Sequence, residues 1–316
     1  MHARAHDARA QTPSGLVMQR KLSNSAAIQT FNFHRSLLED SARTNAYRAA
    51  IEDVVREGDV VADIGCGTGI LAMFACRAGA RRVYAIEEEA VIEIARELAH
   101  ANGFDDRITF IAGSSLNAAL PERVDVVVTE TMGNNGLDEQ IAGTIAHARD
   151  AFLKEGGTII PRALEMIAAP VERSSFHERW PSSYGLDFSP VREHVVNLFH
   201  PLAIARSELL ATPATMARVD APAARGSAAW TITRDAMLSG IAVWFRAELT
   251  PSIAIANEPE SELRCWKQSF FPIAAPRAVR AGEVVRAELQ TFDGIEWVWR
   301  VDEETRTTLK GWPISV

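Results

Sequence analysis

Short apolar runs and helical patterns alternate along the chain from residue 39 to residue 161. Helices are predicted over residues 39–56, 70–79, 88–102 and 141–152. The strands predicted between and after them are 60–65, 82–87, 108–113, 124–130 and 156–161. Because these strands are almost continuously apolar and are separated by helices, they predict an α/β fold with a parallel, doubly wound sheet covered on both faces.

The pattern changes after Pro161, where helical periodicity fades and short β-like runs such as GIAVWFRAEL and IEWVWRVD follow. This change predicts a second, antiparallel β-rich domain. A stretch rich in aromatic residues and proline, about 174–210, is interpreted as an excursion from that domain and not as part of its core. The predicted organisation is a flexible tail and N-terminal segment (1–33), a doubly wound domain (34–160) and a β-rich domain (161–316).

Composition places the chain among ordinary globular proteins. Of the 316 residues, 47% are apolar and 23% are charged, which allows a sizeable core. No run reaches the roughly 18 apolar residues that a membrane span needs, and the first 15 residues lack the apolar stretch of a secretory signal and are interpreted as a loose tail. Cys66, Cys76 and Cys265 form no CxxC pair, which predicts a reduced, cytoplasmic protein. No membrane attachment and no metal site are predicted.

The net charge of −8 is unevenly distributed. Residues 50–160 carry 9 basic and 19 acidic residues, whereas residues 1–49 have a net charge of +4 and residues 161–316 of −2. A nucleic-acid groove needs a basic stripe, so nucleic acid is not expected as a partner. The acidic surplus favours a cationic substrate, although a solvated acidic surface explains it equally well.

The stretch DIGCGTG, residues 63–69, joins the first predicted strand of the sheet to the next helix. Gly65, Gly67 and Gly69 let the backbone turn tightly and approach a ligand closely. The nicotinamide pattern GxGxxG would place its third glycine at position 70, whereas GxGxG is the spacing expected for S-adenosylmethionine. Glu87 ends the next strand, where its carboxylate can accept hydrogen bonds from both ribose hydroxyls. Loop and acid together predict an S-adenosylmethionine site.

A second motif, TETMGNNGLDE over residues 129–139, follows the fourth predicted strand. A continuous helix would place Glu130 and Glu139 on opposite faces, but a loop containing Gly133 and Gly136 can bring both carboxylates into one site. Two close carboxylates repel unless a cation lies between them. A guanidinium fits this position because it is planar, permanently charged and rich in N–H donors. Glu130 and Glu139 are therefore the predicted catalytic residues, holding a guanidinium beside the methyl donor.

The paired acids resemble the double-glutamate loop of the protein arginine methyltransferase family, with Met132 and Gly133 in register, and the resemblance runs from about His34 to the late 290s. It implies a Rossmann-like methyltransferase domain followed by a β-barrel, with a helical dimerisation arm at about 174–210 and a head-to-tail homodimer. HRSLLEDSARTNAY, residues 34–47, resembles the helix that covers the cofactor. By this resemblance Arg43 pairs with the cofactor carboxylate and His34 is a nearby contact.

The same resemblance implies further roles. It gives Asp63, Gly65 and Glu87 cofactor-binding roles, and it places Leu116 where the family has an acid that reads the adenine. On the substrate side it places four residues: Asp40, Met132, Cys265 and Trp266.

The chain departs from the family pattern chiefly on the substrate side. Arg264, Cys265 and Trp266 stand where the family has Thr-His-Trp, and Thr131 and Asn134 stand where its loop usually has Trp and Tyr. In the family the histidine pairs with an acid on the N-terminal helix, where this chain has Asp40. We expect that Cys265 cannot replace a cationic histidine as the partner of Asp40.

The leading hypothesis is an S-adenosylmethionine-dependent N-methyltransferase acting on the guanidinium of arginine in a protein, a peptide or the free amino acid. The altered substrate side motivates an alternative, a tailoring enzyme that methylates an amine, guanidine or hydroxyl of a small natural product. A third hypothesis is a non-catalytic dimer that binds the cofactor and recruits partners, but the presence of both glutamates speaks against it.

Overall fold

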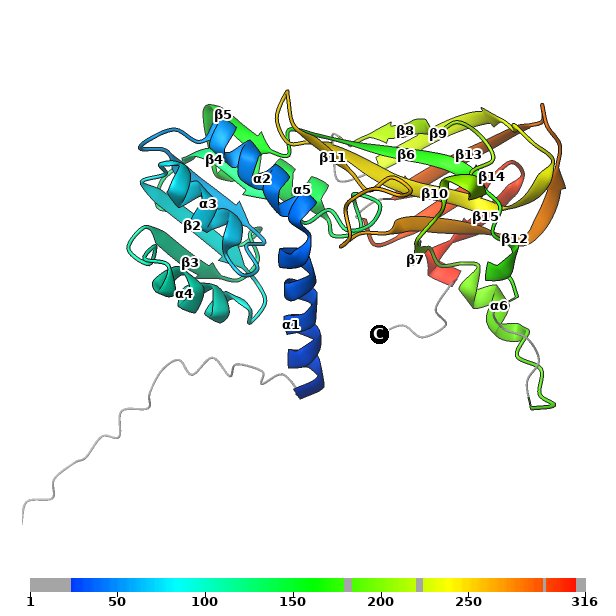
Figure 1. The fold of residues 1–316 in the computed structure, drawn as a ribbon, viewed down its shortest axis with the longest axis horizontal. Helices are drawn as coiled ribbons and strands as arrows, with labels where there is room; N and C mark the ends of the chain where they lie inside the picture. The colour runs from blue at the N-terminus through cyan, green and yellow to red at the C-terminus, as the bar shows by residue number, and fades with distance from the viewer. Residues whose placement is uncertain (1–23, 179–183, 220–223, 292–293, 311–316) are drawn as a thin grey trace, which may run out of the picture.

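The computed structural model describes residues 24–178, 184–219, 224–291 and 294–310. The predicted loose tail, the first 15 residues, lies outside them. Figure 1 shows two domains side by side, with helix α1 (Asn24–Glu39) projecting from the region where they meet. Helix α1 crosses the predicted boundary at residue 33, and none of its residues is buried.

The first domain is built on a sheet of five parallel strands in the order β3-β2-β1-β4-β5. Its strands are β1 (Val60–Ile64), β2 (Arg82–Glu87), β3 (Ile108–Ala112), β4 (Val124–Thr129) and β5 (Leu153–Ile160). Its helices are α2 (Ser41–Val54), α3 (Ile70–Ala78), α4 (Ile92–Ala101) and α5 (Ile141–Ala151). The prediction of a parallel, doubly wound sheet is therefore confirmed.

Alternate residues of each strand face opposite sides of this sheet, as the strand period of two requires. Val61 and Val126 pack with apolar residues of α2, α3 and α4, whereas Val60 and Val127 pack with residues of α5 such as Ala148. Helices on both faces explain why almost every residue of the central strands β1 and β2 is buried and most are apolar.

The second domain is antiparallel, as predicted, and its strands form two sheets. One sheet has the order β7-β12-β10-β6-β8, with β11 paired to β10, and the other has the order β15-β14-β13-β9. The strands of the first sheet are β6 (Ala163–Val171), β7 (His200–Leu202), β8 (Ala214–Arg218), β10 (Ala236–Glu248), β11 (Ala254–Ala256) and β12 (Gln268–Val279). Those of the second are β9 (Ala224–Thr231), β13 (Val284–Thr291), β14 (Trp297–Val301) and β15 (Glu304–Thr307).

The segment 174–210 packs more closely against the β-rich domain than predicted. It contains helix α6 (Pro190–Val195), the 3₁₀ turns η1 (Ser174–Phe176) and η2 (Arg206–Glu208), and strand β7, which pairs with β12. Phe176, Val196 and Ile204 are buried in a cluster with Trp244 and Phe270. The interpretation of the whole segment as an excursion outside the core is therefore wrong, because its two ends are packed against the sheet. Residues 179–183 of this segment lie outside the described residues.

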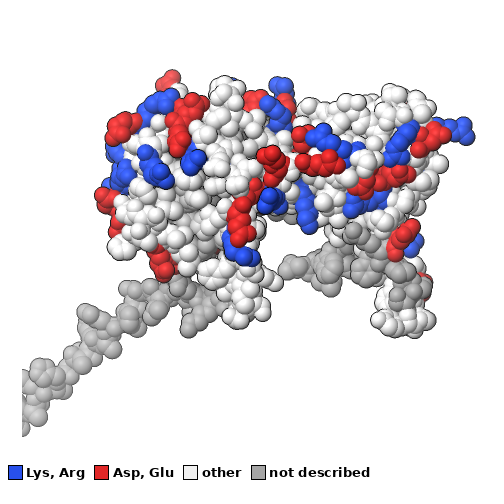
Figure 2. All heavy atoms as spheres, viewed as in Figure 1, with Lys and Arg blue, Asp and Glu red and all other residues white. Residues whose placement is uncertain are grey.

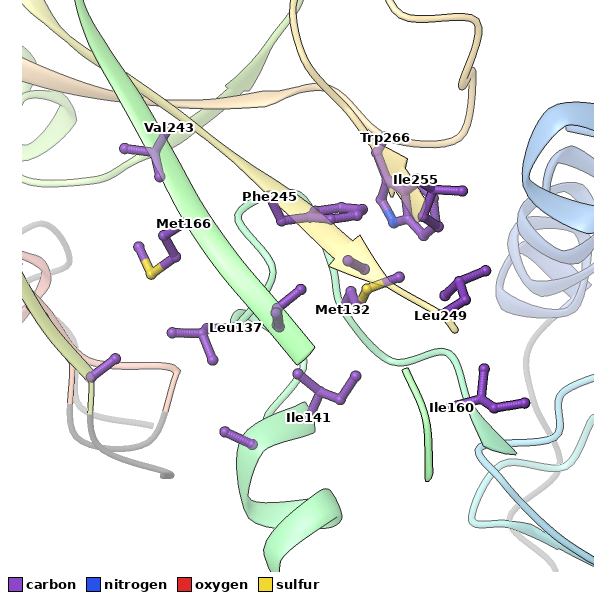
Figure 3. Packing of buried hydrophobic residues seen from close by; sticks show 14 of the residues in the cluster. Met132, Leu137, Ile141, Ile160, Met166, Val243, Phe245, Leu249, Ile255 and Trp266 are labelled. Atoms are coloured by element: carbon purple, nitrogen blue, oxygen red, sulfur yellow. The ribbon is translucent and has the colours of Figure 1, made fainter. Parts of the chain in front are cut away.

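The apolar core continues from one domain into the other. Figure 3 shows Met132, from the loop after β4, lying among Phe245, Leu249 and Ile255 of the β-rich domain. Leu137 of the same loop is also buried in this cluster. The loop that carries the two predicted catalytic acids is therefore anchored on the second domain.

On the face shown in Figure 2, acidic and basic side chains are interspersed over both domains. Among the described residues, no helix has the length and apolar character needed to cross a membrane.

Candidate active site

A cavity of about 620 Å³ opens at the carboxyl ends of β1, β2 and β4. Strands β1 and β4 are neighbours at the point where the strand order reverses direction, and ligands of open α/β sheets bind in the crevice at such a point. Of the predicted site residues, ten line this cavity: His34, Arg43, Gly65, Gly67, Glu87, Leu116, Glu130, Glu139, Cys265 and Trp266. Sequence-distant segments of both domains thus meet around one space.

The glycine loop forms the floor of the cavity. Gly65 and Gly67 adopt φ values of +68° and +53°, in the left-handed region that favours glycine. A Cβ on Gly65 would lie 2.6 Å from Cγ2 of Thr131, and one on Gly67 would lie 3.1 Å from Cε1 of His34. Gly69 does not line the cavity but caps α3. Side chains at 65 and 67 would therefore narrow the space that the bare backbone leaves open.

Glu87 lies at the end of β2 and holds this loop in place. One carboxylate oxygen accepts a hydrogen bond from the Gly67 N–H and the other from the Glu89 N–H, each at 2.9 Å. Each oxygen retains a further lone pair, so the carboxylate can still accept hydroxyl donors from a ligand.

Asp63 lies beneath the loop and does not line the cavity. Its Oδ2 accepts the Ala72 N–H at 2.9 Å, which ties β1 to the first turn of α3, while its buried Oδ1 has no hydrogen-bond partner among the described residues. Burial raises the pKa of Asp63 to about 7, although the Ala72 N–H opposes this shift. Its position supports the shape of the glycine loop rather than direct contact with a ligand.

Glu130 follows β4 and is paired with Arg43 of α2. Nε of Arg43 donates to Oε2 of Glu130 at 2.7 Å, and Nη2 donates to the same oxygen. Both side chains are almost fully buried, with exposed fractions of 7% and 6%. Burial raises the pKa of the Glu130 carboxyl, and the charge of Arg43 opposes that shift. The third nitrogen of Arg43 donates to the Leu37 carbonyl, so each of the three guanidinium nitrogens has a protein acceptor.

Glu139 lines the same cavity as Glu130 and is open to it. Glu139 is an exposed residue, but the protein around the carboxyl displaces part of its solvent, and this desolvation raises its pKa to about 7. The negative charges of Glu130 and Asp138 add to the shift. The two glutamates thus face one space and feel each other's charge, as the loop hypothesis requires.

Asp40 is the N-cap of α2 and a junction between the domains. Its Oδ1 accepts the Arg43 N–H at 3.1 Å, and its Oδ2 accepts the N–H groups of Arg264 and Cys265 at 2.6 and 2.9 Å. Burial alone would raise the pKa of Asp40, but these donors outweigh it and the pKa lies below its ordinary value. Asp40 does not line the cavity, and neither does Met132, whose side chain is buried and whose N–H donates to Glu130.

Two family models match adjacent parts of the chain. The model described as "Ribosomal protein L11 methyltransferase (PrmA)" matches residues 43–164, and the model described as "Arginine methyltransferase oligomerization subdomain" matches residues 162–302. Protein arginine N-methyltransferase 1 of Saccharomyces cerevisiae is 30% identical over 279 residues, which cover 82% of this chain and 80% of that protein. The enzyme of the same name from Dictyostelium discoideum is 31% identical, covering 81% and 80%.

The chain belongs to the protein arginine N-methyltransferase family. It is an S-adenosylmethionine-dependent methyltransferase, which confirms the predicted enzyme class and cofactor. The solved structure of the Trypanosoma brucei PRMT1 enzyme-prozyme complex with AdoHcy is similar, with a TM-score of 0.79 and 26% identity over 88% of this chain and 97% of that one. Arabidopsis thaliana protein arginine methyltransferase 10 agrees in fold, with a TM-score of 0.74 at 23% identity over 88% of this chain and 99% of that one.

The substrate side differs from the family in a way that the structure makes clear. Cys265 supplies no cation to Asp40; instead, the backbone N–H groups of Arg264 and Cys265 bind the carboxylate. Burial also raises the pKa of the Cys265 thiol, which stays neutral beside Asp40. Trp266 packs edge-to-face on Phe245, with ring centroids 5.0 Å apart. The contact between helix and loop therefore persists without a cationic side chain.

Several residues around the cavity were not predicted. Gln29 and Thr30 of α1 line it, as do Gly143 and Thr144 of α5. Asp138 was also missed, although it lies within the quoted acidic motif. Its carboxylate accepts the N–H groups of Asn134 and Asn135, each at 3.2 Å, and a Cβ on Gly133 would lie 2.1 Å from its Oδ1. The glycine at 133 and the acid five residues later were the available signal for this turn.

Proposed function

We propose that this enzyme transfers a methyl group from S-adenosylmethionine to a guanidinium nitrogen of arginine in a protein or peptide. The observation that carries the proposal is the placement of Glu130 and Glu139 in one cavity with the glycine loop and Glu87. The names of the relatives, protein arginine N-methyltransferases, favour this acceptor over a small natural product.

The cofactor end of the cavity suits an adenosyl group. S-adenosylmethionine supplies an electrophilic methyl group on a sulfonium. We propose that Glu87 accepts hydrogen bonds from the ribose hydroxyls, that Gly65 and Gly67 allow the close approach, and that Leu116 packs against the adenine. His34 lies over the glycine loop, and burial lowers its pKa, so it acts as a neutral contact.

Glu130 is suited to bind a guanidinium, as its contact with Arg43 illustrates. One of its oxygens accepts two N–H donors of the Arg43 guanidinium, and a carboxylate offers about four lone-pair positions. Glu130 can therefore accept from a substrate guanidinium while Arg43 keeps it ionised and oriented. We propose this positioning role for Arg43, in addition to the contact with the cofactor carboxylate that the family resemblance implies.

Glu139 is suited to receive a proton. A guanidinium that gains a methyl group must lose a proton from the same nitrogen, and a base with a pKa near the working pH is effective at this step. With its pKa raised to about 7, the Glu139 carboxylate fits that requirement. We propose that Glu139 holds the second side of the acceptor and accepts this proton.

We further propose that the enzyme works as a homodimer in the cytoplasm. The match of residues 162–302 to an oligomerization subdomain supports assembly, and Tyr184 and Leu186 near the tip of the arm are exposed apolar residues available for an interface. The free cysteines are compatible with a reducing compartment. Close approach of β8 and β9, where a Cβ on Gly226 would lie 2.3 Å from the Met216 carbonyl oxygen, supports closure of the two sheets into a barrel.

The test is methyl transfer from labelled S-adenosylmethionine to a set of matched acceptors. An arginine peptide should be labelled, whereas the same peptide with lysine in place of arginine should not. Free arginine and small guanidines measure how much of the surrounding peptide is needed. Labelling of small amines or hydroxyl compounds in preference to the arginine peptide would support the tailoring alternative, and absence of transfer to any acceptor would support the non-catalytic one.

A further inference from the structure

Asn257 directly follows β11. It lies between the acidic loop of the first domain, residues 129–139, and the Trp266 segment of the second domain, residues 264–267. Its side chain is 1% exposed. Its Oδ1 accepts the Phe245 N–H at 2.9 Å, and its Nδ2 donates to the carbonyl oxygens of Asn134 and Lys267, each at 2.7 Å. One amide thus bonds to three separate segments of backbone.

Asn134 closes this arrangement into a ring. Its own side-chain oxygen accepts the Lys267 N–H at 2.8 Å. Both the N–H and the C=O of Lys267 are therefore bonded, one to Asn134 and the other to Asn257. A second amide, Gln268, donates to the Asn257 carbonyl at 2.7 Å and steadies the far side of the ring. Asn257 and Gln268 are buried and Asn134 is partly buried, whereas Lys267 is exposed and contributes its backbone groups. Because these hydrogen bonds support one another, the ring favours one relative placement of the segments.

The two segments that this ring joins both contribute residues to the lining of the cavity. Asn134 lies midway between Glu130 and Glu139 in the acidic loop, and Lys267 directly follows Cys265 and Trp266. The amide of Asn257 bridges 123 residues of chain to reach Asn134.

Apolar packing alone would hold these segments near each other without fixing their register. Met132 and Leu137 are buried against the second domain, as Figure 3 shows, and a Cβ on Gly136 would lie 2.8 Å from Cβ of Phe245. Apolar contacts are non-directional, whereas hydrogen bonds to backbone groups specify position and orientation. Asp138 fixes only the internal shape of the loop, through Asn134 and Asn135.

We propose that Asn257 is a positioning residue for the acceptor site, fixing the loop of Glu130 and Glu139 against the Trp266 segment through Asn134 and Lys267. This inference rests on the proposed function, because it assigns the acceptor to that space. The inference concerns only one end of the cavity, because among the described residues the glycine loop and Glu87 have no hydrogen bond to the ring.

The isosteric variant Asn257→Asp tests this most sharply. It keeps the oxygen that accepts the Phe245 N–H but replaces the donor nitrogen with an oxygen facing two carbonyl groups. Asn197→Asp is a matched control. Asn197 is also fully buried, and its Nδ2 donates to the Glu193 carbonyl at 2.7 Å, but it lies at the end of α6 and does not line the cavity. Both variants should lose thermal stability, so stability alone does not distinguish them.

We expect Asn257→Asp to lower kcat/KM for an arginine peptide about tenfold or more while the Kd of S-adenosylhomocysteine changes less than about twofold. Amide hydrogen exchange should become faster in residues 131–139. Asn197→Asp should leave both quantities near their wild-type values at temperatures where it is folded. Combining Asn257→Asp with Asn134→Ala should give less than the product of the two single effects, because both act on one ring.

Unchanged exchange in residues 131–139 together with unchanged kcat/KM for Asn257→Asp would overturn the proposal. An equal kinetic loss in Asn197→Asp would overturn it too, since it would reveal a general effect of instability. Absence of methyl transfer by the wild-type enzyme would contradict only the proposed function, because hydrogen exchange still measures the coupling.

Discussion

The two ends of the cavity are built in different ways. The proposed cofactor end comes from one domain and largely from residues 63–89, where the Glu87 carboxylate accepts backbone N–H groups of Gly67 and Glu89. The proposed acceptor end is lined by Arg43 of α2, by residues of the acidic loop and by Cys265 and Trp266, which come from both domains. The first is a property of one βαβ unit, and the second exists only when the two domains are packed together.

The electrostatics of the two ends differ as well. Glu87 is satisfied by neutral backbone N–H groups, whereas Glu130 is paired with a buried cation and Glu139 has its pKa raised to about 7. Substitutions at the acceptor end should therefore strongly lower kcat, or the free energy of unfolding where a buried charge loses its partner. Substitutions at the cofactor end should change cofactor affinity by smaller amounts.

The largest effect is expected for Glu139→Gln. The amide keeps the size of the side chain but cannot accept the proton or balance the guanidinium charge, so kcat should fall by about 10²–10⁴-fold. Glu130→Gln should lose activity by a similar factor. Initial rates with an arginine peptide measure this, and binding of S-adenosylhomocysteine should be unchanged. Glu155→Gln, at an exposed position outside the cavity, is the control; near-wild-type turnover of either site variant would contradict the acceptor hypothesis.

Arg43→Met should be the next largest change. It leaves the buried Glu130 carboxylate without its cation, which costs about 3–5 kcal/mol of unfolding free energy for a buried pair. Denaturant unfolding measures this. The double variant Arg43→Met/Glu130→Gln should recover much of the loss, because no uncompensated charge remains. Arg96→Met, which removes an exposed pair with Glu93, should cost at most about 1 kcal/mol; an equal loss in both single variants would refute the importance of the buried pair.

Glu87→Gln should have a moderate effect confined to the cofactor end. Replacing a charged acceptor with a neutral one weakens its hydrogen bonds by about 1–1.5 kcal/mol, or about tenfold in the Kd of S-adenosylhomocysteine. Calorimetry gives this Kd directly. With saturating cofactor, kcat should stay within a few-fold of wild type. Glu97→Gln on the outer side of α4 serves as the control, and a large fall in kcat at saturation would break the separation between the two ends.

Activity and stability should depend on pH in opposite directions. Between about pH 4.5 and 7, kcat/KM should rise with pH, whereas the contribution of Glu139 to the free energy of unfolding should fall. If Glu139 must be ionised, kcat/KM should rise with pH and level off above about 7, falling about tenfold per unit below it. The folded state retains a proton that the unfolded chain releases above about 4.5, so this group's contribution to stability is lost as pH rises toward 7. Rate profiles of wild type and Glu139→Gln test this, because the residual activity of the variant should lack the acid limb.

The difference between the two ends of the cavity also explains how much of the fold and of the site could be predicted from the sequence. The strand β2 was predicted with its observed bounds and the other strands of the parallel sheet within a few residues, because burial on both faces leaves a clear apolar signal. Helix α4 begins at Ile92 and not at residue 88, because the Glu87 carboxylate binds the Glu89 N–H and holds those residues outside the helix.

The acceptor end was only partly predictable. The acids of TETMGNNGLDE were identified because both belong to one short motif, and their function followed from charge. Asn257 gave no signal, since a single asparagine after a short strand says nothing about a partner 123 residues away. The bond between Asp40 and the Cys265 segment was not predicted, for a related reason. Its donors are backbone N–H groups, which every sequence supplies and no sequence pattern marks.

The most direct test is a crystal structure of the enzyme with S-adenosylhomocysteine and an arginine peptide. We predict that nitrogens of the substrate guanidinium lie within about 3 Å of carboxylate oxygens of both Glu130 and Glu139, with the cofactor ribose on Glu87. A guanidinium bound outside this cavity, or one contacting neither glutamate, would contradict the account.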